Sequence, residues 1–429
     1  MKRKLFSRNF TLLVLGQISS LFGNYILRLA LSMYVLEVTG SAAVFAGILS
    51  AATIPTILLS PLGGILADRA DKRKVMVALD ALTGTVVLCV AALLSGGNAI
   101  AVISLLLVAL SVLGAFETPT VQACIPQMLS GDDIVRGNAV VNQVASVSYL
   151  TAPMLGGVLY VAFGLKPVMD ISVVCFFITA SFECFIRLRR QPMGHGGNVL
   201  RVIRHDFIIS IKFMAQERTD ILKLLLLAAL SRFFVMVVTL VGLPFLVRMV
   251  LGLDAKYYGG AESALAVATI LGSAAAGLLT GKLKTGGLSW LLAAMGLCMI
   301  PAGAVFLLPI GVFGRYMVNV AAFCGMQIAV SIFSVFAVSL IQQNTPGDLI
   351  GKVMAYTSAV TLCAQPAGQT VYGFLFDGFR EAVFLVLVPT GAAVCLIGLL
   401  SCGFFRKMES ACQACGNQTE KVSSDSGKE

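Results

Sequence analysis

The sequence predicts an all-α membrane protein with twelve transmembrane helices, arranged as two pseudo-symmetric bundles of six. Of the 429 residues, 58% are hydrophobic and only 12% are charged, whereas a soluble domain has about a quarter charged residues. The apolar residues form long continuous runs, as expected of helices that need about 20 residues to cross a bilayer. One long polar interruption, at 188–220, separates the runs into two sets.

The apolar runs give twelve expected spans in chain order, with boundaries expected to within a few residues. The predicted spans are 10–36, 43–66, 74–95, 99–118, 135–160, 167–187, 221–247, 257–281, 286–309, 311–342, 349–376 and 380–405. The first run is too long for the core of a signal peptide and lacks a convincing cleavage site, so we expect it to be retained as a helix.

Lysine and arginine predict the orientation of the spans, because cytoplasmic loops carry an excess of both. Basic residues precede the first span and follow every even-numbered one. Both termini are therefore expected in the cytoplasm, in a multi-pass protein of the cytoplasmic (inner) membrane. Although the formal charge is +10, the basic residues lie in short clusters between apolar runs, which argues against a nucleic-acid partner.

The polar interruption predicts the domain organisation. We expect an N-terminal bundle at 1–187, a cytoplasmic linker at 188–220, a C-terminal bundle at 221–405 and a disordered cytoplasmic tail at 406–429. Within the linker, 199–216 has the pattern of a basic amphipathic helix on a membrane surface, and a merely solvated connection fits about as well. The two halves echo each other in Gly131-Asp132 and Gly347-Asp348, as in transporters built from parallel repeats.

The loop after the second span, PLGGILADRADKRK from Pro61 to Lys74, is the most specific motif. Together with Thr39-Gly40-Ser41, Thr118-Pro119, the helix-5 run from Pro153 to Gly157 and Gly351-Lys352, it resembles the major facilitator superfamily. Within it, these motifs look like the macrolide-efflux and siderophore-exporter branch. This resemblance implies the major facilitator fold and export by alternating access, normally against an inward flow of protons.

The same loop supplies the expected gating residues. Asp68 lies where it can meet the positive N-terminus of another helix, and in the family that partner is the eleventh helix, here starting near Gly347. Asp71 and Lys72 depart from the family pattern, so the partners of the loop are left open. A role in orientation alone is the alternative. The predicted gating residues are Gly64, Asp68, Arg69, Lys72, Arg73 and Glu117.

The fifth span contains a proline and glycines, Pro153, Gly156 and Gly157, which resemble a motif of exporters. Proline and glycine permit a bend and close helix packing. A role in packing alone is equally compatible with the pattern, because both residues are common in membrane helices.

Charged residues inside spans indicate a transport pathway, because they are costly in lipid. Arg28 and Arg232 are the deepest cations, and Asn24 lies one turn before Arg28. A structural pair, for example Arg28 with Asp170, is the alternative. The substrate-pathway candidates are Asn24, Arg28, Arg232, Phe233, Met236 and Met326.

Proton coupling requires a carboxyl that burial keeps able to hold a proton. The candidates are Asp80, Glu117, Glu183 and Glu262, and each falls near the end of a predicted span. No nucleotide-binding loop, catalytic triad or metal motif occurs, and the Cys412/Cys415 pair lacks a second pair of ligands. We therefore expect no enzymatic activity, cofactor or metal.

The predicted function is secondary export of an amphipathic small molecule, such as a drug, macrolide or siderophore-like compound. Protons are the expected coupling ion, and the chain is expected to act as a monomer in the lipid bilayer. Two alternatives are import of an anionic nutrient through Arg28 and Arg232, and a membrane sensor or scaffold without transport activity.

Overall fold

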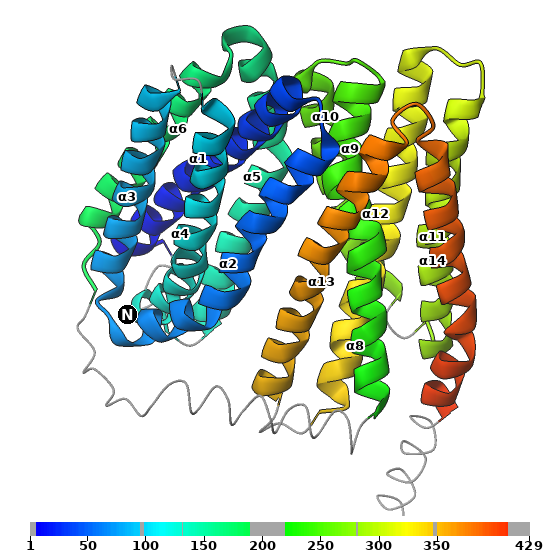
Figure 1. Cartoon of the computed structure of the whole chain (residues 1–429). Helices are drawn as coiled ribbons and strands as arrows, with labels where there is room; N and C mark the ends of the chain where they lie inside the picture. The colour runs from blue at the N-terminus through cyan, green and yellow to red at the C-terminus, as the bar shows by residue number, and fades with distance from the viewer. Residues whose placement is uncertain are drawn as a thin grey trace, which may run out of the picture. The chain divides into compact units, whose positions relative to one another are not determined.

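The computed structural model describes residues 6–94, 98–130, 132–188, 219–279, 282–345 and 350–410. A helix occupies each of the twelve predicted positions (Figure 1). Eleven helices in these ranges are long and apolar enough to cross a membrane. The predicted helical membrane fold is confirmed. The amphipathic segment at 199–216, most of the linker, and Cys412 and Cys415 lie outside the described residues.

The first six helices follow the predicted spans closely at most boundaries. They are α1 (Arg8–Thr39), α2 (Ala42–Arg69), α3 (Lys72–Leu93), α4 (Ala99–Met128), α5 (Asp132–Phe163) and α6 (Leu165–Cys184). Side chains at their starts explain several boundaries: Ser7, Ser41 and Asp71 each accept a hydrogen bond from a first-turn amide of the following helix.

The fourth helix is ten residues longer than the predicted span, which ended at residue 118. Glu117 and Pro119 suggested a loop there, yet the helix continues through both. The added segment stays helical because Val121, Cys124 and Ile125 are buried in a core cluster with Phe10 of α1. Glu117 consequently lies well inside α4 and not at its end.

The seventh predicted span is a single helical run that changes type along its length. It begins as α8 (Thr219–Ser231) and continues through π-helical turns at Arg232–Met236, Val238–Gly242 and Leu246–Val250. The short α9 (Leu243–Phe245) lies between the second and the third of these turns. Such wider turns are uncommon and frequently occur at functional sites. The later helices are α10 (Ala255–Leu279), α11 (Leu288–Ala304), α12 (Val312–Gln343), α13 (Ile350–Gly378) and α14 (Phe384–Leu400).

The chain forms two compact units that divide three of these helical runs. The first unit comprises Met1–Leu200, Val237–Ala266 and Gln365–Gly378, and the second comprises Arg201–Met236, Val267–Ala364 and Phe379–Glu429. In the first unit, α1 packs against α5 and α6, α3 against α4 and α6, and α2 against α4. In the second, α11 packs against α12 and α14.

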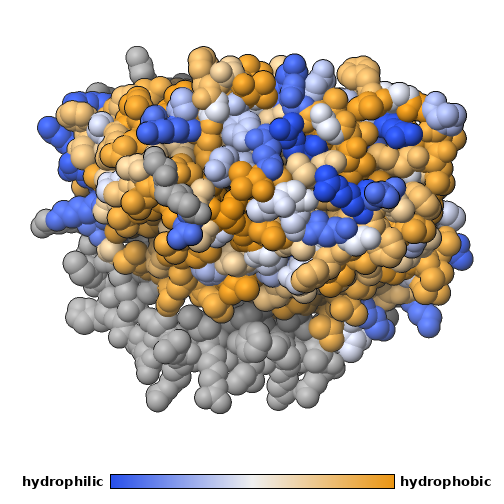
Figure 2. All heavy atoms as spheres, turned by 45° about the horizontal axis from the view of Figure 1, so that its top comes forward, coloured by the Kyte–Doolittle hydropathy of each residue, from blue (hydrophilic) through white to orange (hydrophobic). Residues whose placement is uncertain are grey.

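The surface of the described residues is strongly apolar. Leu58, Leu278 and Leu400 are each about 70–80% exposed. Figure 2 shows hydrophobic side chains over most of the visible face. Water would strongly disfavour so much exposed apolar area, whereas lipid would not. The chain is therefore a multi-pass membrane protein.

Candidate functional site

The predicted gating loop connects α2 and α3 through a tight turn. Asp71 caps α3 by accepting from the Lys74 amide at 3.4 Å. Gly63 makes α2 and α4 approach closely, since a side chain there would overlap the Ala115 carbonyl. The surroundings of Gly64, the side chains of Asp68 and Arg69, and the segment 346–349, where the partner of Asp68 is expected, lie outside the described residues. The latch stays a prediction.

The other predicted gating residues have separate partners. Lys72 is only 8% exposed in the first turn of α3. The Arg73 guanidinium donates a hydrogen bond to the Cys184 carbonyl at the end of α6. Glu117 accepts a hydrogen bond from Ser20 of α1. These contacts connect the start of α3 with α6, and the middle of α4 with α1.

The helix-5 motif lies where α5 comes closest to two other helices of the first unit. An added Cβ on Gly157 would lie 2.6 Å from the Ala255 carbonyl oxygen of α10, and one on Gly156 would lie 3.1 Å from the Ile26 Cα of α1. Gly259 of α10 in turn faces the Pro153 carbonyl with no room for a Cβ. The small residues therefore allow backbone-to-backbone packing of these helices.

Three acidic side chains lie close together in the interior of the first unit, two of them in contact with one hydroxyl. Ser20 of α1 lies 3.1 Å from an Asp80 oxygen of α3 and 3.2 Å from a Glu117 oxygen of α4. Glu183 of α6 adjoins Asp80, and both residues are only 1% exposed. We call Ser20, Asp80, Glu117 and Glu183 the acid cluster. Four helices thus bring together three of the four proton-carrier candidates.

A second polar group of the first unit combines tyrosines with a carboxyl. The Tyr25 and Tyr149 rings meet edge to face, with centroids 5.6 Å apart. The Tyr258 hydroxyl donates to a Glu262 oxygen at 2.5 Å, and the Glu262 carboxyl interacts electrostatically with Tyr25 and Tyr149. We call Tyr25, Tyr149, Tyr258 and Glu262 the tyrosine cluster.

The predicted pathway residues of α1 lie between these two clusters. The Arg28 Nε donates to the Asn24 side-chain oxygen at 2.6 Å. Arg28 also interacts electrostatically with Tyr25 and with Glu117. It therefore faces one member of each cluster.

The predicted pathway residues of the second unit divide between a cavity and the packed interior. A cavity of about 240 Å³ is lined by apolar side chains, hydroxyl groups and one guanidinium, with Arg232, Met236, Phe333, Thr357 and Thr361 among its residues. Phe233 packs edge to face on Phe234 with centroids 5.0 Å apart. Met326 is 1% exposed and belongs to the core. Such a lining suits an amphipathic molecule.

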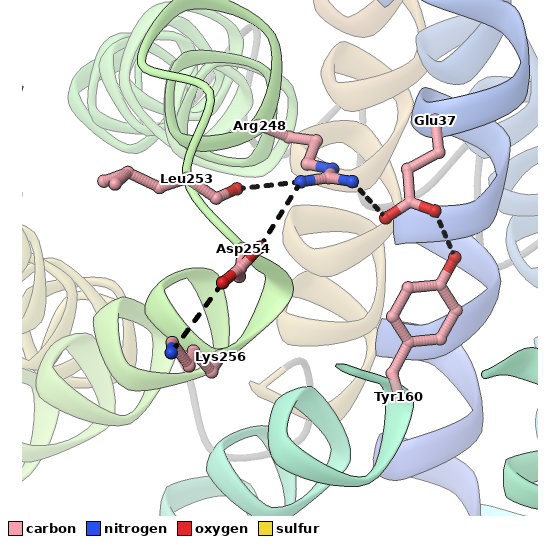
Figure 3. A network of polar contacts seen from close by, with 6 residues as sticks. All are labelled: Glu37, Tyr160, Arg248, Leu253, Asp254 and Lys256. Atoms are coloured by element: carbon pink, nitrogen blue, oxygen red, sulfur yellow. Dashed lines mark hydrogen bonds and ion pairs between the residues drawn. The ribbon is translucent and has the colours of Figure 1, made fainter. Parts of the chain in front are cut away.

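A network of paired charges connects Glu37, near the end of α1, with Tyr160 of α5 and with Arg248 (Figure 3). The Arg248 guanidinium contacts one Glu37 oxygen at 2.8 Å, and the Tyr160 hydroxyl donates to the other at 2.7 Å. Arg248 also donates to the Leu253 carbonyl at 3.2 Å and lies 4.0 Å from Asp254. We call this the Glu37–Arg248 network, and it connects α1, α5 and the segment before α10.

Near the same end, Asp377 of α13 caps the N-terminus of α2. Its carboxylate accepts from the Ser41 hydroxyl and the Ala42 amide, each at 2.5 Å, and from the Ala43 amide at 2.9 Å. An acidic side chain is favoured there because a helix N-terminus carries unpaired amides and a partial positive charge.

A stripe of polar residues on α1 predicts part of these sites. Ser20, Asn24 and Arg28 recur every four residues and so share one face of the helix. Our sequence interpretation used Asn24 and Arg28 but omitted Ser20. Tyr25, Tyr149 and Tyr258 were also missed, because tyrosines in apolar runs are usually packing residues.

A helical membrane protein with buried charges, an amphipathic cavity and glycine-mediated helix contacts has the features of a transporter. The chain belongs to the Major Facilitator Superfamily, whose family model matches residues 13–369. It is a transporter of this superfamily, and its relatives include a macrolide efflux protein and a staphyloferrin A transporter, similar to the branch that the motifs predicted.

Two curated relatives and one solved structure illustrate the similarity. Macrolide efflux protein A of Streptococcus pyogenes is 25% identical over 378 residues, covering 84% of this chain and 88% of the relative. The staphyloferrin A transporter of Staphylococcus aureus is 26% identical over 159 residues, covering 36% and 40%. A crystal structure of a peptide transporter in complex with alafosfalin matches with a TM-score of 0.75, 15% identity and coverage of 95% and 97%. This last likeness concerns the fold alone.

Proposed function

We propose that this transporter exports an amphipathic small molecule from the cell by alternating access, in exchange for protons. The macrolide-efflux relative supports efflux as the direction. The proposed substrate class includes drugs, macrolides and siderophore-like compounds. The proposed setting is the cytoplasmic membrane, with both termini inside, a monomeric chain and the two bundles at 1–187 and 221–405.

The observation that carries the substrate class is the tyrosine cluster. Aromatic rings provide large apolar contact areas, and their faces attract cations. The Glu262 carboxyl beside them is a polar anchor, and Tyr149 is 40% exposed. An amphipathic molecule with a cationic group fits this chemistry, because its apolar body meets the rings and its charge meets the carboxyl.

The gating proposal places the closing contacts at both ends of the helices. At one end, Asp68 is the proposed latch toward the eleventh helix. At the other end, the Glu37–Arg248 network and the Asp377 cap connect parts of the chain that are distant in sequence. Alternating access requires that closing contacts at the two ends form and break in turn.

Expression in a pump-deficient host tests export, with ethidium as the hydrophobic cationic probe. We expect cells that express the protein to accumulate less ethidium, and an uncoupler to abolish the difference. Tyr149→Ala and Glu262→Gln should each raise accumulation toward that of cells without the transporter, at equal membrane abundance. Glu381→Gln removes an exposed acid and serves as the control. Equal accumulation with and without the wild-type protein would contradict the proposal for this class of probe.

Import of an anionic nutrient is the second candidate, because Arg232 lines the cavity of the second unit. An imported anion would enter cells faster when the protein is expressed, and Arg232→Gln would reduce the uptake. Uptake of a panel of labelled carboxylates measures this. Ethidium efflux by the wild-type protein, with no uptake of any carboxylate in the panel, favours the export proposal.

A further inference from the structure

We propose that the acid cluster is a proton-binding site, in which Asp80, Glu117 and Glu183 share an exchangeable proton around Ser20. The four residues come from α3, α4, α6 and α1, so the site is built by the packing of the first unit. Its use in transport rests on the proton exchange proposed above. Proton binding by the cluster does not depend on that proposal, and a separate experiment measures it.

The hydrogen-bond arrangement around Ser20 requires an additional hydrogen. The hydroxyl lies within 3.1 Å of an Asp80 oxygen and 3.2 Å of a Glu117 oxygen. A serine hydroxyl has one hydrogen to donate, while an ionised carboxylate can only accept. Both contacts are fully made when one carboxyl is protonated and donates to the Ser20 oxygen, while the hydroxyl donates to the other.

The burial of two further carboxyl oxygens gives a second, separate reason to place a proton in the acid cluster. Within the described part of the chain, Asp80 Oδ2 and Glu183 Oε2 are buried without a hydrogen-bond partner. An ionised carboxylate in an apolar interior costs several kcal/mol unless it is paired, and a bound proton removes that cost. Since Asp80 and Glu183 adjoin each other, a proton between them satisfies two acceptors at once.

The charged and titratable neighbours do not balance three carboxylates. From α1, the Arg28 guanidinium faces Glu117. The thiols of Cys184 and of Cys124, on α6 and α4, interact electrostatically with Glu183, and the Lys72 ammonium of α3 interacts with Cys124. Among the described residues, the Arg28 guanidinium interacts with Glu117, whereas no cation interacts with Asp80 or Glu183 in the same way.

A metal ion is a poorer occupant than a proton. No group of three or more His, Cys, Asp or Glu side chains in the described ranges has an arrangement that could hold a metal ion. A proton needs only two neighbouring oxygens, which Asp80 and Glu183 provide.

Arg28 connects the acid cluster with the tyrosine cluster through electrostatic interactions. Its guanidinium interacts with Glu117 on one side and Tyr25 on the other, and Tyr25 interacts with Glu262. Protonation of the acid cluster weakens the hold of Glu117 on Arg28, which strengthens the influence of the guanidinium on the tyrosine cluster. A positively charged substrate and a proton would then compete through Arg28, as exchange requires.

Infrared difference spectroscopy of the purified full-length protein tests proton binding without transport. A shift from alkaline to acidic buffer should produce the band of protonated carboxyl groups in the wild type. We expect Asp80→Asn and Glu183→Gln each to lower the amplitude of this band by the equivalent of about one carboxyl group or more. The reason is that removing one acid also disturbs the proton that the others share. Ser20→Ala should shift the frequency without removing a carboxyl.

Two matched variants make the result decisive. Glu381→Gln, at an exposed acid, should leave the protonated-carboxyl band of the wild type in place. Glu262→Gln should remove only the contribution of the tyrosine cluster. The proposal would be overturned if the band were unchanged in both Asp80→Asn and Glu183→Gln while thermal melting showed that both variants are folded. A normal band in a protein that moves no ethidium would leave the proton site standing and refute the export proposal.

Discussion

The acid cluster and the Glu37–Arg248 network use carboxyl groups of the same unit in opposite ways. In the network each Glu37 oxygen has its own donor, the Arg248 guanidinium or the Tyr160 hydroxyl, and the Glu37 and Arg248 side chains are about a quarter exposed. In the acid cluster two carboxyls, those of Asp80 and Glu117, share one hydroxyl, a third adjoins Asp80, and Asp80 and Glu183 are almost completely buried. The balance of donors and acceptors therefore separates a structural contact from a site that can change its protonation.

The largest expected effect is on the close contact between α5 and α10. Gly259→Ala places a methyl group against the Pro153 carbonyl and should force α5 and α10 apart. Overpacking of this kind costs about 1–3 kcal/mol. Thermal melting of the purified protein in one detergent measures the loss.

Gly277→Ala is the matched control, because Gly277 lies on the same helix with open space around its Cα. Alanine favours a helix over glycine, so this variant should melt at the wild-type temperature or above it. Equal melting of Gly259→Ala and Gly277→Ala would show that the α5–α10 approach is not as tight as the structure indicates.

The next effect tests whether the network is a true pair. Arg248→Gln leaves a Glu37 oxygen without its charged donor and should cost about 1 kcal/mol, discounted for partial exposure. Glu37→Gln alone should cost a similar amount. The double variant should cost less than the sum of the two, and strict additivity in this double-mutant cycle would mean that the two charges do not interact.

The cap on α2 gives a smaller effect of the same sign. Asp377→Asn keeps one acceptor but loses the charge and the second oxygen, which together hold the Ser41 hydroxyl and two amides. A loss of about 0.5–1 kcal/mol follows from typical cap energies. A melting temperature equal to that of Glu381→Gln would argue against the cap.

The smallest effect has the opposite sign and separates the two regions most clearly. Asp80→Asn replaces a buried acid by an amide that can donate to the oxygens of Glu117 or Glu183. Since it supplies a missing donor, it should leave stability unchanged or raise it by up to about 1 kcal/mol. A loss larger than that of Arg248→Gln would show that Asp80 is a structural partner and not part of a proton site.

Most of the fold can be predicted from hydropathy, because twelve long apolar runs separated by charged residues indicate twelve membrane-spanning helices. The error at α4 arose because Glu117 and Pro119 resemble a helix end when the packing of Val121 and Ile125 is unknown. Along α1, the stripe of Ser20, Asn24 and Arg28 is visible in the spacing alone.

The partners of that stripe cannot be read in the same way. Asp80, Glu117 and Glu183 looked like separate acids near span ends, since their meeting depends on the register of α3, α4 and α6. The Glu37–Arg248 contact likewise joins residues more than two hundred positions apart, which a single sequence does not reveal.

The central claim is that the acid cluster couples proton movement to export, and gradient-driven transport tests it most directly. Purified wild-type protein in sealed vesicles should drive ethidium against its concentration gradient when a pH gradient is imposed, and an uncoupler should stop it. The Asp80→Asn/Glu183→Gln double variant should still exchange ethidium down its gradient but show no accumulation driven by pH. Accumulation by the double variant to the wild-type level under the same gradient would contradict the account.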